Sequence, residues 1–377
     1  MNEEDYNDYV KLWSRFPNPS NQVFHNRLIH ALSYENTIEV ISLRPFSKKY
    51  CALNKLDKSI HIEGNITWRY MTIKSKAISR YISVMNELPK VIKSIMDENT
   101  VILTDTINPL CLVVAGKISK RFKLPLIGIV KDSPSNTPLT PRKYTITILR
   151  YAKRCHGFIA TTSQLNTLYN DDNKPNIIIE GCAEVNNARP YYSDKPYFFY
   201  CGSLLRRYGI YELINAFKEL QRPDIDLLIA GHSQNDHDLT NAIFGSHNIK
   251  FLGCITHESA LALEKGAMVL VNPRPYSEDL DRFSIPNKVI EYLTSENIIV
   301  SVKNSKIMKS FEDDIIWIDS AYKNDLLSGL RYALSLSYEQ RKAIATRGKE
   351  KVLEMYSKKT VCLKINEFLE QFINKSK

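Results

Sequence analysis

Long hydrophobic runs are absent from this sequence. No stretch approaches the roughly 20 consecutive apolar residues that a membrane-spanning helix needs, and this excludes a protein that crosses a membrane by helices. The first ten residues, MNEEDYNDYV, are acidic, whereas a signal peptide begins with a basic segment followed by an apolar one. We therefore expect a cytoplasmic protein, and peripheral attachment to the inner face of a membrane is left open.

Closely spaced cysteines are absent as well. The seven cysteines never occur as a pair separated by two residues, and most of them lie in apolar runs. This distribution favours buried, reduced thiols over a disulfide framework or a zinc site. We expect neither a metal ion nor a cofactor.

Charge of one sign is not concentrated anywhere. The chain has 51 basic and 41 acidic residues, a formal net charge of +10, and the two kinds are mingled along its length. Nucleic-acid-binding domains gather their lysines and arginines in patches or stripes, so we expect no nucleic-acid partner. Two interpretations of the excess stay open: an evenly basic surface, and attraction to anionic lipid head groups or phosphorylated substrates.

Strand-like and helix-like segments alternate along the 377 residues, of which 44% are hydrophobic. That is enough chain for two domains. Apolar runs predict strands at residues 9–16, 38–43, 101–105, 125–130, 157–161 and 176–180, and then at 197–201, 226–230, 249–252 and 268–271. Helical spacing predicts helices between them, so the pattern indicates an α/β fold with parallel sheets and crossover helices.

One stretch has the features of a nucleotide-binding loop. The apolar run 268–271 predicts a buried strand, and Pro286 suits the first turn of the helix that follows. The loop between them lies at the carboxyl end of a strand, where open parallel sheets bind ligands. Free amides around Ile285, Asn287 and Lys288 would favour an anion there. Glu291, one turn further on, could accept two hydrogen bonds from the vicinal diol of a ribose.

The same stretch resembles the donor site of family 4 retaining glycosyltransferases. The likeness rests on Pro286-Asn287-Lys288 and Glu291-Tyr292, where one branch of the family has Pro-Ser-Lys and Glu-Tyr. It implies the GT-B architecture, in which two Rossmann-like domains face each other across a cleft and a C-terminal helix crosses back to the first domain. It also implies an acceptor-binding domain at residues 1–190, a domain at 191–356 that binds a nucleotide-sugar such as a UDP-sugar, and a crossover helix at 357–377.

A second likeness follows the strand at 197–201. The family has a Gly-Arg-Leu turn there and a Lys-Gly pair before the next helix, whereas this chain has Gly202-Ser203-Leu204 and Tyr208-Gly209. We expect the missing cations to be supplied by Arg206 and Arg207, because the planar fork of arginine can bind two oxygens of a diphosphate at once. Exposed loop arginines are the alternative.

The resemblance assigns the other candidate positions. Catalytic roles fall to Arg206, Arg207, Lys288, Glu291 and Asp132. Donor-binding roles fall to Gly202, Ser203, Gly253, Cys254, Ile255, Arg274, Ser284, Ile285, Pro286 and Asn287. In the first loop the usual glycines are replaced, so Asn18, Ser20 and Asn21 are candidates for phosphate contacts, with a helix cap as the alternative.

Several positions depart from the family. Lys131 stands where the family often has a histidine, and Asp132 is retained, although an ordinary turn would also suit it. Phe283 stands where the family has an earlier glutamate, so contacts to the sugar hydroxyls would come from backbone amides or from Asp281 or Arg282. Two Asp-x-Asp patterns, at 224–226 and 279–281, lack the context of a metal-dependent glycosyltransferase, and we interpret neither as a metal site.

The predicted reaction is transfer of a sugar from a nucleotide-diphosphate donor to an acceptor hydroxyl, with retention and without metal. At the level of the family the acceptor would be a glycan or a lipid-linked molecule in surface polysaccharide synthesis. A basic helix at 142–155 could lie on an anionic membrane or form a solvated face. A catalytically silent GT-B subunit that stabilises a partner enzyme and a nucleotide-sugar epimerase are the alternatives. The oligomeric state is open.

Overall fold

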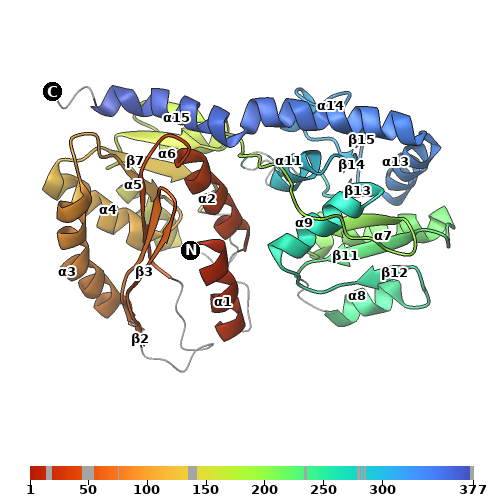
Figure 1. The fold of residues 1–377 in the computed structure, drawn as a ribbon, viewed down its shortest axis with the longest axis horizontal. Helices are drawn as coiled ribbons and strands as arrows, with labels where there is room; N and C mark the ends of the chain where they lie inside the picture. Colours follow the sequence, from red (N-terminus) through yellow and green to blue (C-terminus); the bar gives the residue numbers. More distant parts are fainter. Residues whose placement is uncertain are drawn as a thin grey trace. The chain divides into compact units, whose positions relative to one another are not determined.

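The fold is formed by two compact units, shown in Figure 1. The computed structural model describes residues 1–13, 19–44, 55–74, 76–134, 142–232, 236–277, 281, 283 and 286–373. Unit 1 comprises Met1–Cys182 together with Ser357–Lys377, and unit 2 comprises Ala183–Tyr356. The division thus falls at residue 182, and the sequence had suggested 190.

Unit 1 is built on a parallel sheet of four strands in the order β6-β7-β8-β9. The strands are Ile102–Asp105, Leu126–Val130, Gly157–Ala160 and Asn176–Ile178. The crossover helices are α4 (Pro109–Phe122), α5 (Arg142–Ala152) and α6 (Ser163–Tyr169). Every residue of β7 and β8 is buried, because helices cover a parallel sheet on both faces. The carboxyl ends of β6 and β7 therefore lie next to each other at one edge.

The remaining strands of unit 1 form two smaller sheets. β1 (Ile38–Ser42) and β4 (Ile66–Tyr70) are parallel, and β3 (Ser59–Glu63) is antiparallel to β4. β2 (Lys55–Leu56) pairs with β5 (Ile73–Lys74), after which α3 (Ala77–Ile95) begins. The side chains of Ile66, Trp68 and Tyr70 are buried.

The start of the chain differs from the prediction. The predicted strand at 9–16 is wrong, because α1 (Glu3–Trp13) is a helix and residues 14–18 lie outside the described part of the chain. Three acidic residues in its first turn suit the positive end of the helix dipole. The Asp5 amide donates to Asn2 Oδ1 at 2.8 Å and thereby caps the helix. Tyr6 and Tyr9, one turn apart, are both buried. The first residues of the predicted run, from Tyr9 to Trp13, therefore belong to a helix.

Unit 2 is built on a parallel sheet of six strands in the order β12-β11-β10-β13-β14-β15. The strands are Tyr197–Cys201 (β10), Asp226–Ala230 (β11), Ile249–Phe251 (β12), Val269–Asn272 (β13), Ile298–Val302 (β14) and Ile316–Ile318 (β15). The chain starts at β10, runs outward to β12, and then returns to β13 on the other side of β10. The two connections that leave β10 and β13 therefore diverge, and such a switch point is where open α/β sheets bind ligands.

Helices pack on both faces of this sheet. They are η1 (Arg206–Tyr208), α7 (Ile210–Leu220), α8 (Asp236–Ile243), α9 (His257–Gly266), α11 (Asn287–Thr294), α12 (Ser305–Met308), α13 (Lys323–Ser335) and α14 (Tyr338–Tyr356). Residues of β10 alternate between two cores: Phe198 and Tyr200 belong to one, and Tyr197 and Phe199 belong to the other. The predicted α/β class with parallel sheets is confirmed.

The last helix, α15 (Lys358–Ile373), belongs to unit 1 and lies beside α2 (Pro19–Leu32), as Figure 1 shows. Its buried residues Val361, Ile365 and Phe368 share a core with Leu28 and Leu32 of α2. The predicted return of the final helix to the N-terminal domain is therefore confirmed. Within the described residues, no helix combines the length and apolarity needed to cross a bilayer.

The packing of α15 predicts a difference between two substitutions on the same helix. Ile365→Ala removes a fully buried side chain and should lower the free energy of unfolding by about 2–5 kcal/mol. Leu363→Ala is the matched control, because the Leu363 side chain is 44% exposed and its loss should cost no more than about 0.5–1 kcal/mol. Urea denaturation followed by circular dichroism measures both. An equal decrease in the free energy of unfolding in both variants would contradict the packing of Ile365 in the core of unit 1.

Candidate functional site

The turns that follow β10, β11 and β12 form one hydrogen-bonded wall at the switch point of unit 2. The Gly202 amide donates to the Ala230 carbonyl at 3.0 Å, and the Gly231 amide donates to the Gly253 carbonyl at 2.9 Å. A methyl group on Gly231 would lie 1.7 Å from the Gly202 carbonyl oxygen, so only glycine permits this approach. Gly253 is in the left-handed region, with φ of 69°, and has open space beside its α-carbon.

A lysine between two buried carboxylates lies beside this wall. The Lys288 Nζ is 3.3 Å from Glu264 Oε1 and also contacts Glu291 Oε1. Glu264 is 0% exposed and Glu291 is 4% exposed. Burial alone would lower the pKa of Lys288, but negative charge at Cys201, Glu291 and Glu264 raises it well above its ordinary value. Burial raises the pKa of the Cys201 thiol to about 11, so at neutral pH the two carboxylates hold the ammonium.

Tyr292 connects the same helix to the end of β10. Its side chain is fully buried, and its hydroxyl accepts a hydrogen bond from the Cys201 amide at 3.0 Å. Because Cys201 is the last residue of β10, this bond sets the position of α11 against the wall of turns. The sequence suggested a ribose contact for Glu291 and gave no separate role to Tyr292. The structure gives each residue a separate task, since Glu291 holds Lys288 and Tyr292 holds the strand end.

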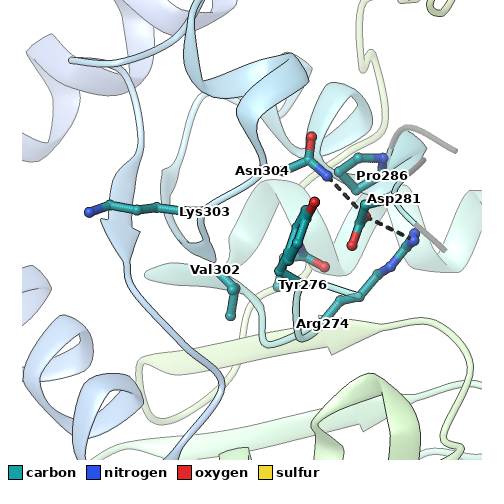
Figure 2. Close-up of a pocket in the computed structure, with 8 residues that line it drawn as sticks. Arg274, Tyr276, Asp281, Pro286, Val302, Lys303 and Asn304 are labelled. Carbon is teal, nitrogen blue, oxygen red and sulfur yellow. Dashed lines mark hydrogen bonds and ion pairs between the residues drawn. The ribbon is translucent and has the colours of Figure 1, made fainter. Parts of the chain in front are cut away.

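The loop after β13 is fixed by a polar network around Asp281, which Figure 2 shows. Asp281 Oδ1 accepts from Arg274 Nη2 at 3.1 Å and from Asn304 Nδ2 at 3.0 Å, and Oδ2 accepts from the Ser277 amide at 2.7 Å. Asp281 is buried, and both of its oxygens are engaged inside the unit. Its predicted contact with a sugar hydroxyl stays a prediction. Arg282 lies outside the described residues.

A small polar pocket opens beside this network (Figure 2). Figure 2 shows Lys303 pointing away from Asp281, and its Nζ pairs with Asp319 instead. The lining residues are Asn272, Arg274, Tyr276, Asp281, Pro286, Val302, Lys303 and Asn304. The pocket therefore lies at the carboxyl ends of β13 and β14, next to the start of α11.

The turn that carries Arg206 and Arg207 meets the same loop. Gly209 has φ of 76°, and a methyl group on it would lie 2.1 Å from the Pro273 carbonyl oxygen. The Arg207 and Arg274 guanidinium groups lie 5.2 Å and 6.0 Å from the centre of the Tyr208 ring. Arg206 lies over Tyr211 of α7 instead, at 4.4 Å. The structure thus brings Arg207 and Arg274 to one aromatic ring.

Arg274 and Lys288 both act on Tyr200 of β10. Burial raises the pKa of the Tyr200 hydroxyl, and the charges of Lys288 and Arg274 both lower it. The hydroxyl of Tyr200 donates to the Ser203 carbonyl at 2.8 Å. Arg274 came from the resemblance as one donor-binding residue among ten, and no pattern in the sequence singled it out.

The other predicted donor-binding residues lie along the same edge. Ser203 and Cys254 are exposed on the turns, and Ile255 is partly buried against the core. Pro286 is buried at the N-cap of α11, and Asn287 is its first residue. Ser284 and Ile285 lie outside the described residues. The roles proposed for all these positions stay predictions.

In the first Asp-x-Asp pattern, each carboxylate has its own basic partner. Asp224 pairs with Arg222 at 2.6 Å, and Asp226 accepts from Lys250 at 2.6 Å. Asp279 lies outside the described residues. In the part of the chain that the structure describes, no group of three or more histidine, cysteine, aspartate and glutamate side chains could hold a metal ion.

The first loop of unit 1 is only partly described. Asn18 and the side chain of Ser20 lie outside the described residues, and Asn21 Nδ2 donates to Asp105 Oδ2 at 3.4 Å.

Two aspartates of unit 1 have local partners. Asp132 Oδ1 accepts from the Ser133 amide at 2.8 Å, as expected of a turn former. His25 Nε2 lies 3.5 Å from Asp105 Oδ2. Sequence reasoning missed this pair; the aspartate at the end of a predicted strand could have indicated Asp105, but not its partner.

Lys131 has an unusual environment at the end of β7. Its Nζ lies 5.2 Å from the centre of the Phe24 ring. Burial lowers the pKa of this lysine to about 8, although Asp132 and Asp105 act in the opposite direction. The charged form is therefore less stable in the folded protein than in the unfolded chain.

Comparisons with known proteins agree with this geometry. Residues 184–351, which lie in unit 2, match the family model described as Glycosyl transferases group 1. No curated protein matches the chain.

Solved structures similar to the whole chain include sucrose-phosphate synthase from Thermosynechococcus elongatus, with 14% identity, a TM-score of 0.69, and coverage of 96% of this chain and 94% of that one. An E. coli structure described as trehalose-6-phosphate bound with UDP-2-fluoro glucose has 12% identity, a TM-score of 0.66, and coverage of 92% and 95%. Anabaena HepE in complex with UDP has 13% identity, a TM-score of 0.62, and coverage of 81% and 87%. At these identities the likeness establishes the fold.

The burial of Lys131 predicts a pH-dependent change in stability. Below pH 8 the wild-type protein keeps this ammonium charged at a cost, and the cost disappears between pH 8 and 10.5 as the folded protein loses the proton first. Lys131→Met should therefore raise the free energy of unfolding at pH 7 by about 1–3 kcal/mol, and the gain should vanish by pH 10.5. Urea denaturation at pH 7, 9 and 10.5 measures it.

Lys120→Met is the matched control, because Lys120 is exposed on α4. It should change stability little at any of the three pH values. A gain in Lys131→Met that is constant with pH would contradict the buried charge as its cause.

Proposed function

We propose that this protein is a glycosyltransferase that takes a sugar from a nucleoside-diphosphate donor bound in unit 2 and transfers it to an acceptor hydroxyl. The observation that carries the proposal is that the guanidinium groups of Arg207 and Arg274 lie 5.2 Å and 6.0 Å from the centre of the Tyr208 ring, and that Arg274 lines the pocket beside the start of α11. This position lies within residues 184–351, which match Glycosyl transferases group 1. The description of HepE as a complex with UDP-glucose supports a UDP-linked donor.

The two arginines suit the difficult step of such a transfer. The bond from the anomeric carbon to the diphosphate oxygen breaks, and its electron pair leaves with the diphosphate. Negative charge therefore grows on the phosphate oxygens, and fixed cations and amides stabilise this charge more in the transition state than in the ground state. The acceptor oxygen bonds to the anomeric carbon, and its proton passes to the leaving phosphate. Retention at that carbon belongs to the same proposal.

Lys288 takes a different role from the one expected from sequence. Its single positive charge is shared with two buried carboxylates, Glu264 and Glu291, so the group of three is negative overall. A phosphate would gain little from it. We therefore place Lys288 as the residue that positions Glu291, and Glu291 as the acceptor of hydrogen bonds from the ribose hydroxyls. Asp281 is likewise a positioning residue, because it holds the guanidinium of Arg274.

The acceptor is proposed to bind unit 1. A glycan or a lipid-linked molecule of surface polysaccharide synthesis is the class that the sequence suggested. Contact with an anionic membrane is supported by α5, where Tyr144, Ile146 and Arg150 are exposed. A helix that shows aromatic, aliphatic and basic side chains to solvent can bind the interface of an anionic bilayer.

The proposed role of Arg274 predicts weaker nucleotide binding when its charge is removed. Arg274→Met should lower the affinity for the preferred nucleoside diphosphate by about 10–100-fold, since a charge-assisted bidentate contact contributes on the order of 1.5–3 kcal/mol. Arg331→Met is the control, because Arg331 is exposed on α13. Calorimetry with UDP and GDP measures both variants. A wild-type protein that binds neither nucleotide would favour the catalytically silent subunit.

The proposed role of Glu291 predicts a loss that depends on the ribose. Glu291→Gln should weaken UDP or GDP binding by about tenfold or more, because a neutral amide is a poorer acceptor for the two ribose hydroxyls than a carboxylate. Binding of inorganic pyrophosphate, which has no ribose, should stay unchanged. Glu264→Gln is the control on the other side of Lys288, and it should affect thermal stability more than nucleotide affinity. Equal weakening of pyrophosphate and nucleotide in Glu291→Gln would remove the ribose assignment.

A further inference from the structure

The three-stranded sheet of unit 1 ends in a strand that presents isoleucines to solvent. β3 (Ser59–Glu63) pairs with β4 and, among the described residues, with no other strand. The side chains of Ile60 and Ile62 are 59% and 71% exposed. One edge of β3 therefore presents backbone N–H and C=O groups that β4 does not reach, beside two large apolar side chains.

The two isoleucines lie on a polar face of this sheet. Residues directly opposite each other share a face, so Ile60 lies beside Arg69 and Ile62 lies beside Thr67. The Arg69 guanidinium is held by the Glu39 carboxylate of β1, with N–O distances of 2.7 and 3.1 Å. The two positions of β4 that face the isoleucines are therefore polar.

The other face of β3 fixes the strand to unit 1. The remaining three residues of the strand lie opposite the buried side chains of Tyr70, Trp68 and Ile66. The Trp68 indole donates to Glu63 Oε2 at 3.3 Å, and His30 Nε2 of α2 lies 3.7 Å from Glu63 Oε1. Since these contacts lie within unit 1, the open edge of β3 is formed before any partner binds.

The sequence of β3 is self-complementary when two copies are placed antiparallel. A register centred on His61 pairs all five residues of the strand. It places Ile60 opposite Ile62 of the second copy, so four isoleucines meet on one face. On the other face it places Ser59 opposite Glu63 of the second copy, where a hydroxyl can donate to a carboxylate. A slip by one residue would put the isoleucines of the two copies on opposite faces.

We propose that β3 is a dimerisation strand, which pairs antiparallel with β3 of a second copy of this chain about a two-fold axis at His61. The two three-stranded sheets then form one continuous sheet of six strands. Such an interface is isologous, because both copies use the same surface. An open strand edge is the usual template for this kind of pairing. The dimer involves unit 1 and does not depend on the proposed sugar transfer.

A second copy suits this edge better than other occupants. A helix laid on the isoleucines would leave the backbone groups of the edge without partners, and a strand of another protein would have to supply matching apolar residues. A second copy of β3 brings both. Five residues per copy form a smaller contact than the roughly 800 Å² per partner of a standard interface. We therefore expect a reversible dimer with a dissociation constant in the micromolar range.

Sedimentation equilibrium of the full chain, over a concentration series that spans the micromolar range, tests the dimer. Ile62→Lys should raise the dissociation constant about tenfold or more, because the two-fold axis brings two charges into the apolar patch. Ile78→Lys is the matched control, since Ile78 is 76% exposed on α3 and should leave the equilibrium unchanged. Circular dichroism and thermal unfolding verify that both variants fold.

A cysteine at the two-fold axis tests the register. His61→Cys should place two thiols opposite each other, because directly opposite residues of an antiparallel pair have α-carbons about 4.5–5.5 Å apart, which suits a disulfide. Oxidation should link two copies, and peptide mapping should locate the disulfide at position 61 of both. Ser59→Cys is the matched control, since it lies on the same face of β3 but does not face itself in this register.

Three results would overturn the proposal. They are a monomer at every concentration, a dimer that Ile62→Lys weakens no more than Ile78→Lys does, and a dimer that His61→Cys links no better than Ser59→Cys does. Calorimetry with UDP and GDP on the same preparation tests the donor site of unit 2, so a failure of the proposed function is distinguished from a failure of the dimer.

Discussion

The position of the Lys288 ammonium between Glu264 and Glu291 is the constraint on which the donor half of this protein depends. Two carboxylates that are almost completely buried could not both stay ionised without a cation between them. Lys288 therefore fixes α9 against α11, because Glu264 belongs to the first helix and Glu291 to the second. Tyr292, on the following position of α11, extends this fixation to the end of β10.

This arrangement explains how a loop can present cations at a definite place. The loop after β13 is held at one end by Asp281, which binds Arg274, and at the other by the packing of Pro273 on Gly209. The two arginines that share the Tyr208 ring are consequently carried by segments that are far apart in sequence but mutually fixed. Preorganised charge of this kind stabilises a developing negative charge without having to rearrange during the reaction.

The sequence predicted most of the sheet architecture and the location of the candidate site, because both follow from local patterns. Apolar runs such as the one at Asp226–Ala230 are long and uninterrupted where a strand is buried on both faces. The strand predicted at residues 9–16 was wrong because a short apolar run fits a strand or a helix equally well. The spacing of the buried residues Tyr6 and Tyr9 fits a helix. The pairing of His25 with Asp105 could not be predicted, because 80 positions separate the two residues and only the fold brings them together.

The carboxyl edges of the two parallel sheets differ in the charged side chains that they present. At the edge of unit 2, Arg207 and Arg274 lie within about 6 Å of the centre of one tyrosine ring, which suits a ligand that carries negative charge. At the edge of unit 1 the cation is a lysine whose pKa burial lowers to about 8, and carboxylates surround it. A lysine kept in a place where its charge is unfavourable reduces the stability of the fold, and such residues are enriched at functional sites. The two edges therefore present different chemistry to a ligand, with arginines beside an aromatic ring in unit 2 and a partly buried lysine near carboxylates in unit 1.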